Sequence, residues 1–204
     1  MIFFNHHKKN YQHPTLLNKL KMKSYSFFSF LILYICVMLS SCRNKDYDTE
    51  LKMLYSKAID LQLDKYVYLS KNADSTSNKN ADYLLLHYID SSACNMCALN
   101  ATKTWYDKLK KEPYYTKITP IILFSPLKNN RGEYFNQLYY TSDLNADIYV
   151  DTCKMFLSRN DHIPQKHIFY ILLLDKQYNV QIIGDPIRNS KINELITDLI
   201  CKKE

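Results

Sequence analysis

Glycine is almost absent from this chain, which has only two glycines and one tryptophan among its 204 residues. The sequence contains no glycine-rich phosphate loop, no Ser-His-Asp arrangement and no paired-carboxylate motif. It therefore gives no support to a kinase or a hydrolase. The chain has only one pair of cysteines at C-x-x-C spacing, so a structural zinc site would lack ligands.

Acidic residues are missing from the first part of the chain. Residues 1–41 contain five lysines and no aspartate or glutamate, and an apolar run over residues 27–39 follows the lysines. Basic residues, an apolar segment and then small residues, in that order, are the layout of a secretory signal peptide.

Residues 39–42 read Leu-Ser-Ser-Cys and resemble the lipobox of bacterial lipoproteins. The resemblance implies that residues 1–41 are a removable signal peptide and that Cys42 is lipidated and becomes the mature N-terminus. A more usual signal start lies at residues 22–24, which would make residues 1–21 a mis-assigned extension. A single transmembrane anchor is the alternative, but its apolar run is shorter than the roughly 20 residues that a span needs.

The charge of the rest of the chain is nearly balanced. Without the five lysines of residues 1–41, 22 of the 27 Lys and Arg remain against 20 Asp and Glu, so we expect no nucleic-acid partner. Residues 42–50 are polar and predict a lipidated tether, and residues 51–204 are long enough for one domain. Arg43 stands where an aspartate often signals retention in the inner membrane, which favours a lipid anchor in the outer membrane, facing the periplasm.

Apolar periodicity along residues 51–204 predicts alternating strands and helices. The predicted strands cover residues 66–69, 83–89, 118–124, 148–150, 168–174 and 180–183. The predicted helical segments cover residues 49–63, 98–112, 133–140, 154–157 and 192–200. Parallel β-α-β units followed by an antiparallel hairpin and a helix predict a thioredoxin-like α/β fold, with a central mixed sheet and flanking helices.

A closely spaced cysteine pair opens the second predicted helix. Residues 94–97 read Cys-Asn-Met-Cys and follow an apolar strand and the serine pair 91–92, which predicts a helix cap. Two cysteines at this spacing can close a small disulfide ring. The positive end of the helix dipole favours the thiolate of Cys94, as in a thioredoxin-type redox motif.

Two segments carry a resemblance to a known family. Residues 88–97 resemble the active-site segment of thioredoxin-like periplasmic thiol–disulfide oxidoreductase lipoproteins, and residues 172–186 resemble the terminal hairpin of that group. The match covers most of residues 82–204. It implies that Cys94 is the attacking thiolate and that Cys97 is the resolving thiol, which burial keeps protonated. It also implies a redox partner protein and no organic cofactor.

The sequence departs from this family in three places. The position of the usual cis-proline falls near Phe169, and Pro164 lies five residues earlier. The position of the buried acid beneath the motif falls near Tyr88. The pair at residues 95–96 contains neither the proline nor the histidine of well-studied relatives, which leaves the reduction potential undetermined.

The sequence therefore predicts a membrane-anchored oxidoreductase that exchanges disulfides with exported proteins through Cys94 and Cys97. One alternative is a non-catalytic thioredoxin-like lipoprotein that binds a partner and keeps the same disulfide as a structural link. A less favoured alternative is a copper carrier that adds His162 or His167 to the two thiols.

Four other residues have simpler interpretations. Cys153 and Cys201 stand on apolar stripes of predicted helices and are expected to be small buried hydrophobic residues, with a mutual disulfide left open. Trp105 is expected in the core rather than as a substrate platform. His87 lies in a buried strand and is expected to be a hydrogen-bonded core histidine.

Overall fold

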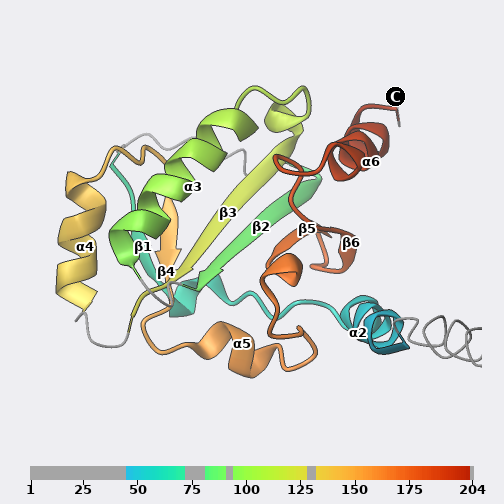
Figure 1. The fold of residues 1–204 in the computed structure, drawn as a ribbon, viewed down its shortest axis with the longest axis horizontal. Coiled ribbons are helices and arrows are strands. Elements are labelled where there is room, and N and C mark those ends of the chain that lie inside the picture. The colour runs from blue at the N-terminus through green and yellow to red at the C-terminus, as the bar shows by residue number, and fades with distance from the viewer. Residues whose placement is uncertain (1–44, 72–80, 91–93, 128–131, 203–204) are drawn as a thin grey trace, which may run out of the picture. The chain divides into compact units, whose positions relative to one another are not determined.

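The computed structural model describes residues 45–71, 81–90, 94–127 and 132–202 (Figure 1). The predictions for Cys42, for the signal peptide over residues 1–41 and for the serine pair at residues 91–92 lie outside these ranges. Within the described ranges, no helix combines the length and the apolar character that crossing a membrane requires.

A single mixed sheet of six strands organises the described chain, in the order β1-β4-β3-β2-β5-β6. The strands are β1 (Val67–Leu69), β2 (Tyr83–Asp90), β3 (Ile118–Ser125), β4 (Ile148–Val150), β5 (Ile171–Asp175) and β6 (Val180–Ile183). Strands β2, β3 and β4 are parallel, whereas β1, β5 and β6 run antiparallel to their neighbours. The predicted central mixed sheet with a C-terminal hairpin is therefore confirmed.

The two central strands are apolar on both faces because helices cover the sheet on both sides. In β2, Leu85 and Leu86 point to opposite faces, and both are at most 1% exposed. Leu85 packs with α3 (Asn95–Leu109) and α6 (Ser190–Cys201), whereas Leu86 lies in the core beneath α2 (Lys45–Ser56) and α5 (Met155–Arg159) (Figure 1). The remaining helix, α4 (Gly132–Thr141), packs beside α3.

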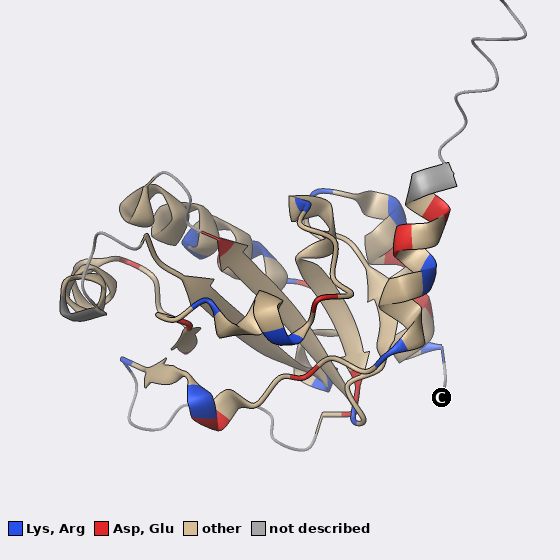
Figure 2. Ribbon diagram, turned by 90° about the horizontal axis from the view of Figure 1, so that it is seen from below, with Lys and Arg blue, Asp and Glu red and all other residues tan. Residues whose placement is uncertain are grey.

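Acidic and basic residues are interspersed along the described ribbon (Figure 2). Several form ion pairs one turn apart on exposed helix faces, such as Lys103 with Asp107 at 2.8 Å. Exposed pairs of this kind contribute at most about 1 kcal/mol each. The apolar packing on the two faces of the sheet therefore contributes more to stability than the surface charges do.

Two predicted boundaries were wrong, the first because of a long-range hydrogen-bonded contact and the second because a local 3-10 helix forms. Helix α2 ends at Ser56 rather than near residue 63, because the side chain of Asn160 holds the following segment in an irregular conformation. Its Oδ1 accepts from the Asp60 N–H at 2.8 Å, and its Nδ2 donates to the Asp60 carbonyl at 3.0 Å. Strand β5 begins at Ile171 rather than at residue 168, because His167–Phe169 forms a 3-10 helix.

The prediction for Cys153 was also wrong. Cys153 is an exposed free thiol in the turn before α5, and Cys201 is a half-buried free thiol at the end of α6. Lys154 adopts a left-handed conformation with φ of 55°, so α5 starts one residue later and Cys153 stays outside the helix. The two cysteines are not joined by a disulfide.

Candidate functional site

The predicted cysteine pair lies at the point where the central strand β2 leads into α3. Cys94 and Cys97 form a disulfide with a Cα–Cα distance of 5.3 Å. Cys94 is the N-cap residue of α3 and has an extended backbone, with φ of −154°. Cys97 lies in the first turn of α3. The disulfide ring therefore closes within one helical turn and does not link two different elements of the fold.

Backbone geometry at the start of α3 favours negative charge on the Cys94 sulfur. The Cys97 N–H donates to Cys94 Sγ at 3.2 Å, in the manner of an N-cap side chain. The positive end of the helix dipole acts on the same atom. Both contacts would stabilise a thiolate at Cys94 once the disulfide opens, and the thiolate is the reactive form of a cysteine.

The exposure of Cys97 differs from the expectation. Cys97 is exposed and Cys94 is half-buried, so the predicted protection of the Cys97 thiol by burial is wrong. The buried positions of this turn are taken by Asn95 and Leu99, which face the interior. Two residues along a helix correspond to a rotation of about 200°, which turns Cys97 away from the side that Asn95 occupies. An external thiol can therefore reach the disulfide directly.

Asn95 has a role that sequence reasoning missed. It is 3% exposed, and its Oδ1 accepts a hydrogen bond from the Leu127 N–H at 3.3 Å. Leu127 lies just after β3. One of the two residues between the cysteines, Asn95, therefore fixes the first turn of α3 to the end of the neighbouring strand.

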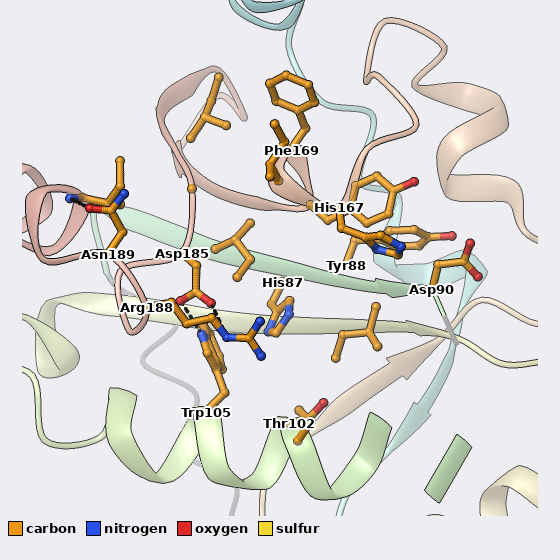
Figure 3. A pocket seen from close by; sticks show the side chains of 18 of the residues that line it. His87, Tyr88, Asp90, Thr102, Trp105, His167, Phe169, Asp185, Arg188 and Asn189 are labelled. Carbon is orange, nitrogen blue, oxygen red and sulfur yellow. Dashed lines mark hydrogen bonds and ion pairs between the residues drawn. The ribbon is translucent and has the colours of Figure 1, made fainter. Parts of the chain in front are cut away.

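A cavity of about 730 Å³ runs beside α3 (Figure 3). Besides α3, its walls come from α2, the end of β2, the segment before β5 and the turn that leads into α6. On the α3 side it is lined by Ala98, Ala101, Thr102 and Trp105, so it begins one turn beyond the disulfide. The cavity therefore lies next to the disulfide along α3.

His87 and Trp105 form an aromatic pair in the wall of this cavity, with ring centroids 4.4 Å apart. Trp105 is 4% exposed, which confirms its predicted place in the core, and its indole N–H donates to Asp185 Oδ1 at 2.9 Å. His87 Nδ1 is enclosed and has no hydrogen-bond partner in the described part of the chain, so the expected hydrogen-bonded core histidine was wrong. Burial lowers the pKa of His87 to about 4, so its ring is neutral at pH 7.

Comparison with known proteins gives matches in structure only. No protein-family model matches the chain, and no curated protein matches its sequence. The N-terminal domain of PilB from Neisseria gonorrhoeae is 17% identical with a TM-score of 0.42, over 60% of this chain and 87% of that one. A thioredoxin-like protein in its oxidised form is 14% identical with a TM-score of 0.47, over 71% of this chain and 97% of that one. A thioredoxin-like protein from Bacteroides caccae is 16% identical with a TM-score of 0.37, over 59% of this chain and 42% of that one.

The fold is identified from the strand order and the cysteine pair of the chain itself. Three parallel strands are followed by an antiparallel hairpin and a helix, and a disulfide of C-x-x-C spacing caps the helix that follows the central strand. The chain has a thioredoxin-like fold. Its residues at the characteristic positions of that fold nevertheless differ from the family pattern.

Tyr88 occupies the position where the family places a buried acid. It is 2% exposed and packs against Phe156 and Tyr170, on the face of the sheet opposite α3. Burial raises the pKa of Tyr88 above its ordinary value, so the phenol stays neutral. The nearest carboxylate along the strand is Asp90, which forms an ion pair with Lys154 at 3.3 Å.

The segment before β5 takes a different form from the proline loop of other thioredoxin-like proteins. Phe169, at the expected proline position, is the last residue of a 3-10 helix and is 1% exposed. The next residue, Tyr170, accepts a hydrogen bond from the Tyr88 N–H at 2.8 Å. Pro164 lies before the 3-10 helix, and all peptide bonds of the described residues are trans. A 3-10 helix therefore forms the wall of the cavity at this point.

The two candidate copper ligands do not join the cysteine pair. His167 is exposed on the 3-10 helix, and His162 is buried near Asp161. In the ranges that the structure describes, no three residues among His, Cys, Asp and Glu are grouped to hold a metal ion. The geometry therefore gives no support to the copper-carrier alternative.

Proposed function

We propose that this protein is a membrane-anchored thiol–disulfide oxidoreductase, which exchanges disulfides with exported proteins through Cys94 and Cys97. One observation carries the proposal: an accessible disulfide closes the first turn of α3, and Cys94 Sγ accepts a helix N–H at 3.2 Å. An exposed cysteine pair in which one sulfur is stabilised as a thiolate after the disulfide opens is suited to exchange.

The same disulfide is poorly placed for a purely structural role. It links residues three positions apart and closes a ring within one helical turn. In the chain-entropy account, such a short loop contributes about 2 kcal/mol, less than a disulfide that joins distant segments. A structural role therefore accounts poorly for this disulfide.

The proposed reaction transfers two electrons between the pair and a substrate. In the reduced protein, the Cys94 thiolate attacks one sulfur of a substrate disulfide and releases the other as a thiolate. Cys97 then loses its proton and attacks Cys94 Sγ, which re-forms the Cys94–Cys97 disulfide and releases the second substrate thiolate. The substrate is reduced and the pair oxidised, and a partner protein with a dithiol or disulfide would restore the pair. Every step is reversible, so the relative potentials set the direction.

Attachment to the membrane is part of the proposal and is supported by the sequence. The basic and apolar order of residues 1–41 and the lipobox-like residues 39–42 would place a lipid on Cys42. The domain would then face the periplasm, with the outer membrane favoured. Incorporation of a labelled fatty acid into the wild type, but not into Cys42→Ala, is the expected result. Equal labelling of both proteins would contradict the anchor.

Trapping of the mixed disulfide tests the exchange reaction. Cys97→Ala removes the resolving thiol, so a mixed disulfide between Cys94 and a disulfide-bonded reporter peptide should accumulate. The exposed Cys153 is replaced by alanine in every variant, because its free thiol could react on its own.

Cys94→Ala in the same background is the matched control and should form far less adduct. The alternative function, a binding module with a structural disulfide, predicts no adduct in either variant and only a loss of stability. Mass spectrometry of the non-reduced proteins distinguishes these results.

A further inference from the structure

Four residues that line the cavity, His87, Trp105, Asp185 and Arg188, lie beside one another in Figure 3. We call this part of the cavity the Arg188 recess. Trp105 follows Cys97 by eight positions on α3, which corresponds to about 12 Å along the helix axis. The recess is therefore outside contact distance of the disulfide but within reach of a substrate bound there.

The carboxylate in the recess, that of Asp185, already has protein partners. Asp185 Oδ1 accepts from the Trp105 indole N–H at 2.9 Å and from the Ile187 N–H at 2.8 Å. Asp185 Oδ2 lies 3.4 Å from Arg188 Nε. These contacts hold Asp185 in place and orient the guanidinium, so Asp185 itself is not the group that would attract a ligand.

Arg188, in contrast, keeps most of its hydrogen-bonding capacity. Its side chain is 79% exposed, and it pairs with Asp185 through Nε. Within the described ranges, the terminal N–H groups of the guanidinium make no hydrogen bond. A guanidinium presents its donors in a planar fork that matches a carboxylate. The free donors therefore suit an acidic group.

His87 makes the same recess compatible with an anion. Its side chain and the Arg188 guanidinium point toward one another in Figure 3, and the ring has no hydrogen bond to the described protein. A neutral imidazole carries one N–H, which it can donate to an oxygen in the cavity. The indole of Trp105, 4.4 Å from the His87 ring, adds an apolar wall for the methylene groups of a bound side chain.

Small side chains of α3 line the cavity on the side toward the disulfide. The helix presents the small side chains of Ala98 and Ala101 to the cavity, and Ala101 is exposed. An extended peptide advances about 3.3 Å per residue. A distance of about 12 Å therefore corresponds to three or four residues of an extended substrate.

We propose that the Arg188 recess selects protein substrates with an acidic side chain three or four residues from the cysteine that reacts with the Cys94–Cys97 pair. The carboxylate would bind the free N–H groups of Arg188 and accept a hydrogen bond from His87. This inference rests on the proposed function, because it assigns substrate specificity to the same site.

Matched reporter peptides test the proposal on the full chain. One set contains a mixed-disulfide cysteine and a glutamate three or four residues away on either side, and the other set has glutamine instead. For the wild type, we expect kcat/KM to be about 10-fold higher for the best glutamate peptide than for its glutamine partner. Arg188→Gln should bring the ratio close to one. Lys191→Gln removes an equal charge from an exposed position of α6 outside the cavity and should keep the ratio.

A wild-type ratio close to one, or a ratio that survives in Arg188→Gln, would overturn the proposal. A binding measurement separates this failure from a failure of the proposed function. Peptides with serine in place of cysteine cannot exchange disulfides, but they should still change the fluorescence of Trp105, the only tryptophan of the chain. If no peptide exchanges disulfides, the proposed function fails. A fluorescence change that requires both glutamate and Arg188 would then still support the recess, and its absence would refute it.

Discussion

His87 should make the stability of this protein depend on pH between about 4 and 6.5. The free energy of unfolding should fall over this range in the wild type and fall less in His87→Phe, which keeps an aromatic ring but cannot titrate. The pKa of the buried ring is lowered from 6.5 to about 4, mainly by loss of solvation, while Asp185 opposes and Arg188 reinforces the shift.

The sign follows from which state binds the proton first. As the pH falls below 6.5, the imidazole of the unfolded chain becomes protonated while the folded ring stays neutral, so the unfolded state gains stability. The contribution of His87 is complete above pH 6.5 and is lost as the pH falls toward 4. A lowering from 6.5 to about 4 corresponds to a loss of about 3 kcal/mol over this range.

Urea unfolding at pH 7, 6, 5 and 4.5, followed by Trp105 fluorescence and by circular dichroism, measures this contribution. Other titrating groups, including the buried His162, act equally on both proteins, so the difference between the two pH profiles isolates His87. Ile171→Val is the control, because Ile171 lies opposite His87 on β5 and does not titrate. It should cost about 1 kcal/mol at every pH. Parallel profiles for the wild type and His87→Phe would refute the reasoning.

Three further results are expected from the described contacts. Asn160→Ala leaves the backbone N–H and carbonyl of Asp60 without their partners at 2.8 and 3.0 Å. Urea unfolding should therefore show that the free energy of unfolding falls by about 2 kcal/mol. A fall of less than about 0.5 kcal/mol would contradict this role of Asn160. Asp151→Ala removes a buried carboxylate that accepts hydrogen bonds from two N–H groups of α5 at 2.8 and 2.9 Å. Thermal unfolding should therefore show that the free energy of unfolding falls by about 1–2 kcal/mol. An unchanged midpoint would exclude a role of Asp151 in capping α5. Iodoacetamide should modify the exposed Cys153 of the native protein faster than the half-buried Cys201, and mass spectrometry showing the reverse order would contradict the assigned exposures.

The sequence predicted the central elements of the fold because their signals are local. Strands β2 and β3 are covered on both faces, so each appears as a mostly apolar run. Helix α3 shows its buried side through the spacing of residues such as Trp105 and Leu109. These three elements position the cysteine pair, which is why the motif could be placed at a helix N-terminus from the sequence alone.

The elements that were mispredicted depend on distant contacts. The end of α2 is set by Asn160, about a hundred residues away from Asp60, and no local pattern records that pairing. Strand β5 was predicted too long because Ile168 is apolar, yet it is 51% exposed on a 3-10 helix. In both cases, tertiary hydrogen bonds or exposure override a propensity that the local sequence expresses.

The cavity could not be predicted because no single segment contains it. Its walls come from α2, β2, α3 and the turn before α6, and only the folded chain brings His87 and Arg188 together. The missing partner of His87 Nδ1 is likewise a property of the packed structure. The exposure of Cys97 follows from which side of the first turn of α3 faces the sheet, and a four-residue motif does not reveal that orientation.

The reduction potential of the Cys94–Cys97 pair tests the proposed function most directly. The full chain, with Cys153 replaced by serine, would be equilibrated in glutathione buffers, alkylated and analysed by mass spectrometry at both cysteines. Our account predicts a reversible two-electron transition between about −120 and −270 mV, the range of known exchange catalysts. A pair that stays oxidised below about −300 mV would be a structural disulfide and would contradict the proposed exchange reaction.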